Sequence, residues 1–256
     1  ANGILSVGGV LYMWVTQQSA WIRAKIGKST DGGHTWVFNS DTAWDFDEPD
    51  GAFSDATFLT FGKDYAGARD NYVYGYSADN RASDPNGTTL TDIDLYRSPV
   101  DQIMNRSAYE FYAGLDGQGN PIWTSDITKR KSIFHDANSV GFAVRVMYHP
   151  TLHRYLMTLW HDRSGSWGIF DAPEPWGPWT TVAYYQNWLS ADFKFGFTFN
   201  QKWMSADGLT LYMVFSGESV YDSFNVIRGT VTLAGGGPAD TTPPSPPGSF
   251  RASEIP

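Results

Sequence analysis

The chain has 256 residues, of which 41% are hydrophobic, 16% aromatic and 18% charged, so it can fill a core and is not globally disordered. Its net charge of −9 argues against a nucleic-acid partner, and no apolar run approaches the ~18 residues of a membrane-spanning helix. Cysteine is absent, which excludes disulfides, thiolate metal sites and cysteine nucleophiles. We expect a soluble, aromatic-rich domain that binds neither nucleic acid nor membrane.

Taken in chain order, the apolar residues come in short runs of β-branched and aromatic residues broken by Gly, Asn and Asp, which predicts strands. The first run turns at Gly8-Gly9, a pair typical of a hairpin. One helical turn is expected, at 99–105. The predicted strand runs are 4–15, 21–28, 35–38, 56–61, 71–77, 91–98, 110–123, 142–148, 155–160, 167–171, 179–184, 197–204, 211–216 and 225–233.

A weak internal repeat runs through these strands. Similar triplets, Leu-Tyr-Met at 11–13 and 211–213 and Tyr-Leu-Met at 155–157, recur within strand groups spaced about 45 to 55 residues apart. This spacing is typical of β-propeller blades, whereas the alternative, a jelly-roll sandwich, does not explain the recurrence. Because the chain opens just before a strand, we expect a five-bladed type with a further blade upstream. The predicted blades are 1–40, 53–126, 140–186 and 195–234.

The tail differs in composition from the rest of the chain. Residues 235–248 are rich in Gly, Pro and Thr and are typical of a linker, which leaves 1–234 as the propeller domain. The segment 240–244 (DTTPP) resembles the junction before a fibronectin type III module in secreted bacterial enzymes, so 249–256 is interpreted as the start of such a module. We therefore expect a secreted protein that is a monomer with several domains.

Residues 29–36 (STDGGHTW) match the Asp-box pattern, Ser-x-Asp-x-Gly-x-Thr-Trp, at every fixed position. In such a turn the Asp31 side chain accepts hydrogen bonds from turn N–H groups, Gly takes a positive φ and Trp36 packs beneath. Asp-boxes close outer hairpins of propellers, so the pattern indicates fold and gives Asp31 a structural role.

The most distinctive stretch is 167–179 (WGIFDAPEPWGPW), in which the prolines and Gly177 favour a rigid outer turn. Burial of Trp in a core is the commoner outcome. An exposed Trp176 could nevertheless stack on a sugar ring. We therefore keep Trp167 and Trp176 as candidate substrate contacts.

Four segments together resemble a known family. They are 63–70 (KDYAGARD), 72–74 (YVY), 167–179 and 202–205 (KWMS). They look like a large bacterial family of largely uncharacterised, carbohydrate-active propellers whose nearest characterised relatives are the five-bladed endo-D-arabinanases. The resemblance covers most of 1–233 and implies a propeller acting on a polysaccharide, without fixing which one.

In a propeller, chemistry lies on the axis, where the starts of the innermost strands converge. Hydrolysis of a glycoside needs two carboxyl groups, ~5–5.5 Å apart for retention or ~6.5–9.5 Å for inversion. Asp55 and Asp136 are the predicted catalytic pair, and Asp192 is predicted to orient the substrate or tune a pKa. The alternative for each is a turn-capping role, since Asp is common in turns. The sequence thus predicts a secreted glycoside hydrolase.

Other polar residues near the predicted strand starts could contact the substrate: His135, Arg145, His161 and Lys194. The same residues could serve a polysaccharide lyase, which needs a cation for the uronate carboxylate and a base for the C5 proton. The acidic net charge disfavours a polyanionic substrate. A glycan-binding propeller without activity is the third hypothesis.

No metal-binding signature stands out. His149 and His153 are four residues apart, but Pro150 between them favours a turn, so we do not expect zinc. No cofactor is predicted. The acidic stretch 41–48 could hold a structural Ca²⁺, although it lacks the pattern of a calcium loop.

Overall fold

The computed structural model describes residues 3–16, 23–39, 46–49, 52–53, 55–79, 90–141, 144–161, 166–189 and 194–233, together with the backbone of 249–253. Nearly all regular structure in these residues is β-strand, as predicted, and three-residue 3₁₀ turns are the main exception. None of the helical turns in this part of the chain has the length or apolarity to cross a membrane. The 3₁₀ turns are η2 (Lys63–Tyr65), η3 (Arg106–Ala108), η4 (Ile127–Lys129) and η5 (Gln201–Trp203).

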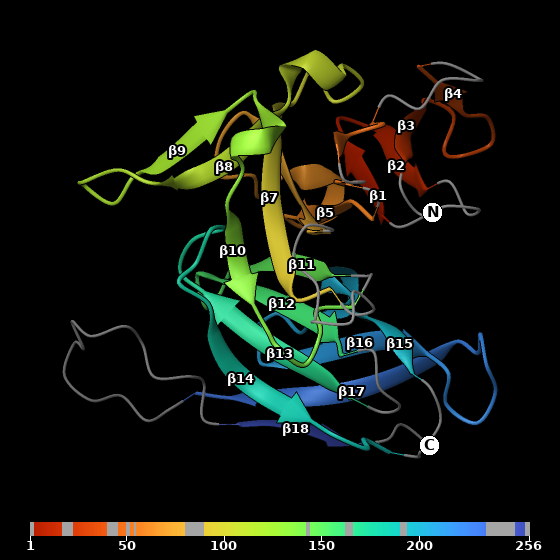
Figure 1. The fold of residues 1–256 in the computed structure, drawn as a ribbon. Helices are drawn as coiled ribbons and strands as arrows, with labels where there is room; N and C mark the ends of the chain where they lie inside the picture. Colours follow the sequence, from red (N-terminus) through yellow and green to blue (C-terminus); the bar gives the residue numbers. More distant parts are fainter. Residues whose placement is uncertain are drawn as a thin grey trace.

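The strands fall into four groups that follow one another along the chain, from red to blue in Figure 1. Group 1 is an antiparallel sheet in which β1 and β2 turn at Gly8 and Gly9, both with positive φ, as predicted. The predicted run 4–15 is thus a hairpin. The strands of group 1 are β1 (Gly3–Val7), β2 (Val10–Thr16), β3 (Ala24–Ser29) and β4 (Val37–Phe38).

Group 2 is larger than the sequence predicts. The single run predicted at 110–123 is two strands, because Asp116 accepts hydrogen bonds from the N–H groups of Gln118 and Asn120 and turns the chain. A further strand, β10, pairs with β7. The strands are β5 (Thr57–Thr60), β6 (Tyr72–Ala78), β7 (Asp92–Pro99), β8 (Glu110–Leu115), β9 (Pro121–Thr124) and β10 (Ser132–His135).

Groups 3 and 4 each contain four antiparallel strands in chain order. The last of them, β18, pairs with β17 at the edge of group 4, although the sequence assigned 249–256 to the start of a separate module. Group 3 contains β11 (Arg145–His149), β12 (Arg154–Trp160), β13 (Trp167–Ala172) and β14 (Thr180–Tyr185). Group 4 contains β15 (Phe195–Phe199), β16 (Thr210–Ser216), β17 (Asn225–Thr232) and β18 (Ser249–Ser253).

The repeated triplets lie in equivalent strands. They are found in β2, β12 and β16, the second strand of groups 1, 3 and 4. Met157 and Met213, the last residues of two triplets, are fully buried. The repeat therefore marks the same core position in groups 3 and 4, whereas in group 1 Met13 is half-buried and Trp14 is the buried residue of β2.

The first strands of the four groups lie side by side and define an axis. β5 and β11 pair in parallel, with Val146 opposite Leu59, while β1 lies beside β5 and β15 beside β11. Within each group the second strand runs antiparallel to the first. The loop before the first strand and the loop after the second strand therefore lie at the same end of the axis, which we call the strand-start end. The opposite end, where the first strands finish, is the strand-end end.

Aromatic side chains join the groups in two cores. In the first, Trp14 of β2 donates from Nε1 to the Tyr96 hydroxyl at 2.8 Å, and that hydroxyl donates to the Thr57 carbonyl at 2.8 Å. A Cβ on Gly75 would lie 2.1 Å from both Tyr96 Oη and the Thr57 carbonyl oxygen, so only glycine fits there. In the second core, Trp167 and Phe197 stack with centroids 5.0 Å apart and join group 3 to group 4.

Candidate functional site

Two of the predicted site residues meet at the strand-start end of the axis. Asp55 lies two residues before β5 and is 6% exposed, and Arg145 is the first residue of β11, the strand paired with β5. Burial lowers the pKa of Arg145 to about 10, and the negative charge of Asp55 opposes that shift. Arg145 therefore stays charged at neutral pH and faces the Asp55 carboxylate.

A second cation at the same end is Lys194, which comes directly before β15 and is fully buried. Its Nζ lies 3.2 Å from Oε2 of Glu218, at the start of the loop between β16 and β17. Glu218 is absent from the predicted site. Glu218 follows β16, the second strand of group 4, and loops after second strands lie at the strand-start end. That position is the signal that could have identified Glu218 as a site residue.

Asp136 and His161 form the third feature of this end. Oδ1 of Asp136 accepts a hydrogen bond from the N–H of Asn138 at 2.8 Å, so the capping role that the sequence left open is present. His161 Nδ1 lies 3.8 Å from Asp136 Oδ2 and 2.8 Å from the Ser139 carbonyl oxygen. Because a carbonyl oxygen only accepts, Nδ1 carries the proton. The imidazole is buried and stacks on Tyr184 at 4.3 Å.

The remaining predicted contacts are scattered. The His135 side chain is 63% exposed and its Nδ1 lies 2.9 Å from Asp92 Oδ2, so it is on the surface. Trp167 is fully buried between Tyr185 and Phe197, which stack on it at 4.9 and 5.0 Å. Its predicted role in sugar contact is corrected to core packing, because its indole faces are covered. Asp192 lies outside the described residues.

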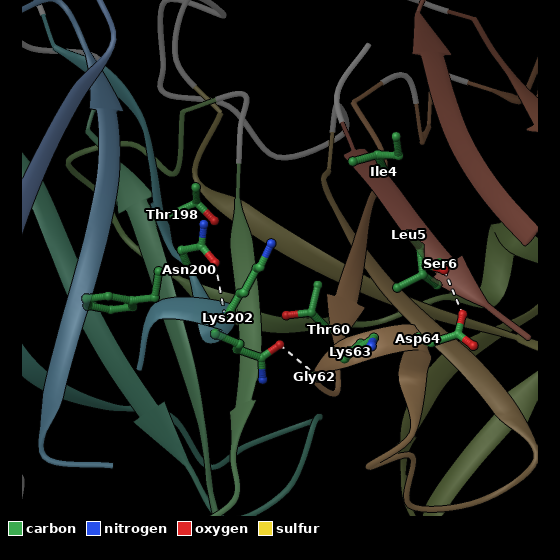
Figure 2. A pocket seen from close by; sticks show the side chains of 12 residues that line it. Ile4, Leu5, Ser6, Thr60, Gly62, Lys63, Asp64, Thr198, Asn200 and Lys202 are labelled. Carbon is green, nitrogen blue, oxygen red and sulfur yellow. Dashed lines mark hydrogen bonds between the residues drawn. The ribbon is translucent and has the colours of Figure 1, made fainter. Parts of the chain in front are cut away.

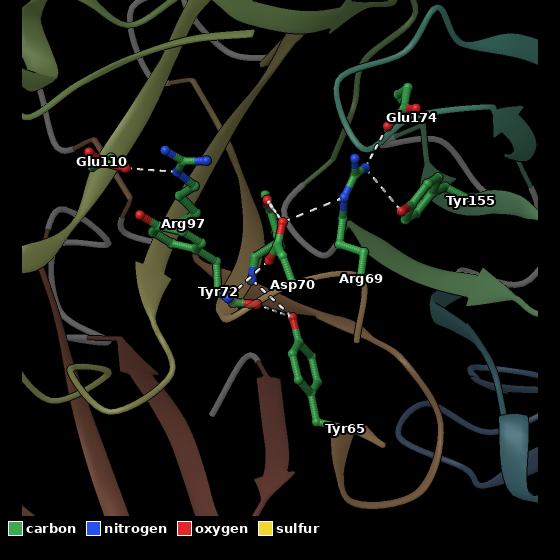
Figure 3. A network of polar contacts seen from close by, with 9 residues as sticks. Tyr65, Arg69, Asp70, Tyr72, Arg97, Glu110, Tyr155 and Glu174 are labelled. Carbon is green, nitrogen blue, oxygen red and sulfur yellow. Dashed lines mark hydrogen bonds and ion pairs between the residues drawn. The ribbon is translucent and has the colours of Figure 1, made fainter. Parts of the chain in front are cut away.

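Trp176 packs beside a polar network between groups 2 and 3, of which Figure 3 shows Arg69, Tyr155 and Glu174. The guanidinium of Arg69 lies 4.9 Å from the Trp176 ring centroid, and its Nη1 donates to Glu174 Oε2 at 2.5 Å. Trp123 packs edge-on to Trp176 at 6.3 Å. The partly buried indole thus holds the 173–178 turn to its neighbours, as the rigid-turn interpretation predicts.

At the strand-end end a cavity of about 770 Å³ lies between β1, the loop after β5 and the loop after β15 (Figure 2). Lys63 and Lys202 line it from two groups. Its one carboxylate, Asp64, accepts hydrogen bonds from Ser6 Oγ at 2.6 Å and from the Gly9 N–H at 2.9 Å, and these lower the pKa of Asp64. Among the described residues that line the cavity, Asp64 is the one carboxyl group, and a second carboxyl group that could act as the acid of a glycoside hydrolase is absent.

Residues 2–226 match the family described as Domain of unknown function (DUF4185). The chain belongs to the DUF4185 family. No curated protein matches it.

Two solved structures are similar in fold to this DUF4185 chain. RS223-Beta-xylosidase matches with a TM-score of 0.51 and 11% identity over 91% of this chain and 70% of that one. CoXyl43, a GH43 beta-xylosidase/alpha-arabinofuranosidase from a compost microbial metagenome, matches with a TM-score of 0.50 and 13% identity over 90% and 69%. These likenesses confirm the predicted all-β propeller class. A third match, from Bacteroides ovatus ATCC 8483, has a TM-score of 0.47 and 13% identity over 83% of this chain and 53% of that one.

The two ends of the DUF4185 propeller axis offer different chemistry. The strand-start end contains Asp55, Asp136 and Glu218 together with Arg145 and Lys194, whereas the cavity at the other end contains one ionised carboxylate. Among the residues that the structure describes, no three His, Asp or Glu side chains gather as metal ligands. Of the acidic stretch 41–48, Asp47 and Glu48 are described, and both form ion pairs with arginines. We therefore place the candidate site at the strand-start end.

Proposed function

We propose that this DUF4185 chain is a glycoside hydrolase whose active site lies at the strand-start end of the axis. The observation that carries the proposal is the buried Asp55 carboxylate, which precedes β5 and interacts electrostatically with Arg145 at the start of the paired strand β11. A carboxylate beside a guanidinium can serve as nucleophile or base in glycoside hydrolysis. The GH43 fold likeness supports the same class of reaction.

Asp136 is the proposed second carboxyl group. Its side chain is 11% exposed and keeps Oδ2 toward His161, 3.8 Å away, while Oδ1 caps the turn. A proton on Oδ2 could therefore be given to the leaving oxygen without breaking the cap. His161 lies beside Asp136, but its Nδ1 proton is donated to the Ser139 carbonyl, so we give it no part in proton transfer. Asp192 stays the proposed third acid.

Hydrolysis is favoured over β-elimination by the state of the two cations at this end, Arg145 and Lys194. Arg145 faces Asp55, and Lys194 lies 3.2 Å from Glu218, so both positive charges are matched by carboxylates of the chain. A lyase needs a cation for the uronate carboxylate of its substrate. A cation that is already matched by a carboxylate of the chain is a poor partner for that uronate.

The test is a screen of the purified protein on a polysaccharide panel, measured both for new reducing ends and for unsaturated products. We expect reducing ends alone. Asp55→Asn and Asp136→Asn should each lower kcat by about 10²–10⁴-fold, the usual size of an acid or base contribution. Asp116→Asn is the control, since Asp116 lies in an exposed turn of group 2. Full activity in both site variants would reject the assignment, and unsaturated products would show a lyase.

Several finer properties stand as proposals beside this one. The family-like motifs support a five-bladed ring related to the endo-D-arabinanases, and the linker-like composition of 235–248 supports a secreted, monomeric protein with several domains. A structural Ca²⁺ near 41–48 remains a proposal of the same rank. The mass of the purified protein in solution would test the monomeric state, and calcium analysis would test the Ca²⁺ site.

A further inference from the structure

An apolar surface lies next to the candidate site, on the loop of residues 217–224 between β16 and β17. Three of its side chains are unusually exposed for their type: Val220 at 66%, Tyr221 at 67% and Phe224 at 74%. Exposed aromatic residues that gather in one loop cost hydration free energy, and such patches commonly mark binding surfaces. The function proposed above does not use them.

The loop is shaped by its own backbone contacts. The Val220 N–H donates to the Glu218 carbonyl at 2.7 Å, the Ser223 N–H donates to the Val220 carbonyl at 3.2 Å, and the Gly217 N–H donates to Ser223 Oγ at 3.3 Å. Ser219 and Asp222 take left-handed φ values of 64° and 60°. Such conformations cost free energy and persist where surrounding contacts hold them. The aromatic side chains are thus presented by an ordered turn.

Two contacts join this loop to the axis. Glu218, at its start, reaches Lys194 directly before the inner strand β15. Tyr221 packs on Phe195, the first residue of β15, with ring centroids 5.4 Å apart. The loop therefore extends outward from the strand-start end, beside the candidate catalytic residues.

We propose that Tyr221 and Phe224 form a sugar-binding platform for a neutral polysaccharide that runs outward from the axial site. Flat aromatic rings bind the C–H faces of sugars while losing little conformational entropy, since each has two side-chain torsions. A neutral chain fits because Lys194 is matched by Glu218, and the loop 217–224 itself has two acids, Glu218 and Asp222, and no Lys or Arg. This inference rests on the proposed function, because it names the substrate class of that site.

The test measures glycan binding in the Asp55→Asn background, by affinity electrophoresis with arabinan, xylan, galactan, mixed-linkage glucan and polygalacturonate. We expect binding to at least one neutral glycan. Tyr221→Ala and Phe224→Ala should each weaken it about 5- to 20-fold, whereas Tyr221→Phe, which keeps the ring, should retain it. Trp203→Ala is the matched control, because Trp203 is 40% exposed but lies in η5 after β15, at the strand-end end.

The outcomes separate this inference from the hydrolase proposal. Unchanged binding in both alanine variants, binding to no neutral glycan, or binding to polygalacturonate alone would overturn the platform. If the platform variants lose binding while the unmodified protein cleaves no glycan, the platform stands and the hydrolase proposal fails. If the unmodified protein cleaves a glycan and the platform variants keep its KM, hydrolysis stands and the platform fails. Thermal unfolding of each variant checks that these exposed substitutions leave the fold intact.

Discussion

At the scale of single residues, a buried charged cluster places Arg130 between Asp79 and Asp94. Its Nη2 lies 2.7 Å from Asp79 Oδ1 and its Nε 2.5 Å from Asp94 Oδ2, and all three side chains are at most 3% exposed. The carboxylates of Asp79 and Asp94 thus share the Arg130 guanidinium in the buried interior. Burial, and then the charge of Asp79, raise the pKa of Asp94 to about 7.

This shift predicts how stability depends on pH. The folded-state pKa of Asp94 lies above the unfolded value of 3.8, so its contribution is full below pH 3.8 and is lost as pH rises through about 7. The free energy of unfolding of the native chain, relative to Asp94→Asn, should therefore fall between pH 4 and 8 by on the order of a few kcal/mol. Urea unfolding of both proteins across this range measures the difference. Parallel curves would contradict the assignment.

At the scale of elements, the turn 173–178 is fastened to group 2 by arginine and aromatic rings. Arg69 reaches Glu174 at 2.5 Å and the Tyr155 hydroxyl at 3.3 Å (Figure 3). Nearby, Arg97 lies 4.1 Å from the ring centroids of both Tyr72 and Trp123. The contacts of Arg69 cross from group 2 to group 3, whereas those of Arg97 stay within group 2. The segments 63–70 and 167–179, which resemble the family, are thus held together by Arg69.

Removing Arg69 should loosen this connection. We expect Arg69→Met to lower the free energy of unfolding by about 1–2 kcal/mol, because a partly buried cation–π contact and its ion pair are lost. Arg69→Lys should restore little, since an ammonium cannot contact Glu174, Tyr155 and the Trp176 face together. Guanidinium unfolding measures both variants. Arg23→Met is the comparison, because its ion pair with Asp47 is exposed, and an equal loss there would contradict the argument.

The elements also show what local sequence can and cannot predict. Period-two patterns and turn residues predicted most strands, because these depend on neighbours in the chain. The split of 110–123 into two strands depended on the Asp116 turn, a local signal that the prediction missed. The pairing of β18 with β17 is a long-range contact that no local pattern encodes.

The candidate site shows the same division. Asp55 and Arg145 were predicted from their position before and within inner strands, since strand starts converge on a propeller axis. The burial of Trp167 could not be predicted, because Tyr185 and Phe197, which cover its indole faces, come from other strands. Predicting Glu218 would have required knowing that loops after second strands lie at the strand-start end.

At the scale of the whole molecule, the groups hold together through contacts between neighbours around the axis. Groups 2 and 3 share the parallel pairing of β5 with β11. Groups 3 and 4 meet where His149 Nε2 lies 2.8 Å from the Gly208 carbonyl oxygen, a junction in which His149 is fully buried. The site depends on these junctions, because Asp55, Arg145 and Lys194 come from groups 2, 3 and 4.

Gly208→Ala tests the junction of groups 3 and 4. Gly208 has a φ of 73°, and an added Cβ would lie 2.6 Å from both His149 Cε1 and Thr151 Oγ1. Gly119→Ala is the matched control, with a φ of 85° and no atom within 4 Å of its Cβ. Left-handed strain alone should cost the control about 1–2 kcal/mol. Overpacking should cost Gly208→Ala about 1–3 kcal/mol more. Because β15 lies beside β11 near this junction, the variant should lose the proposed hydrolysis at temperatures where the control keeps it. Equal unfolding free energies for the two variants would show that the junction carries no such strain.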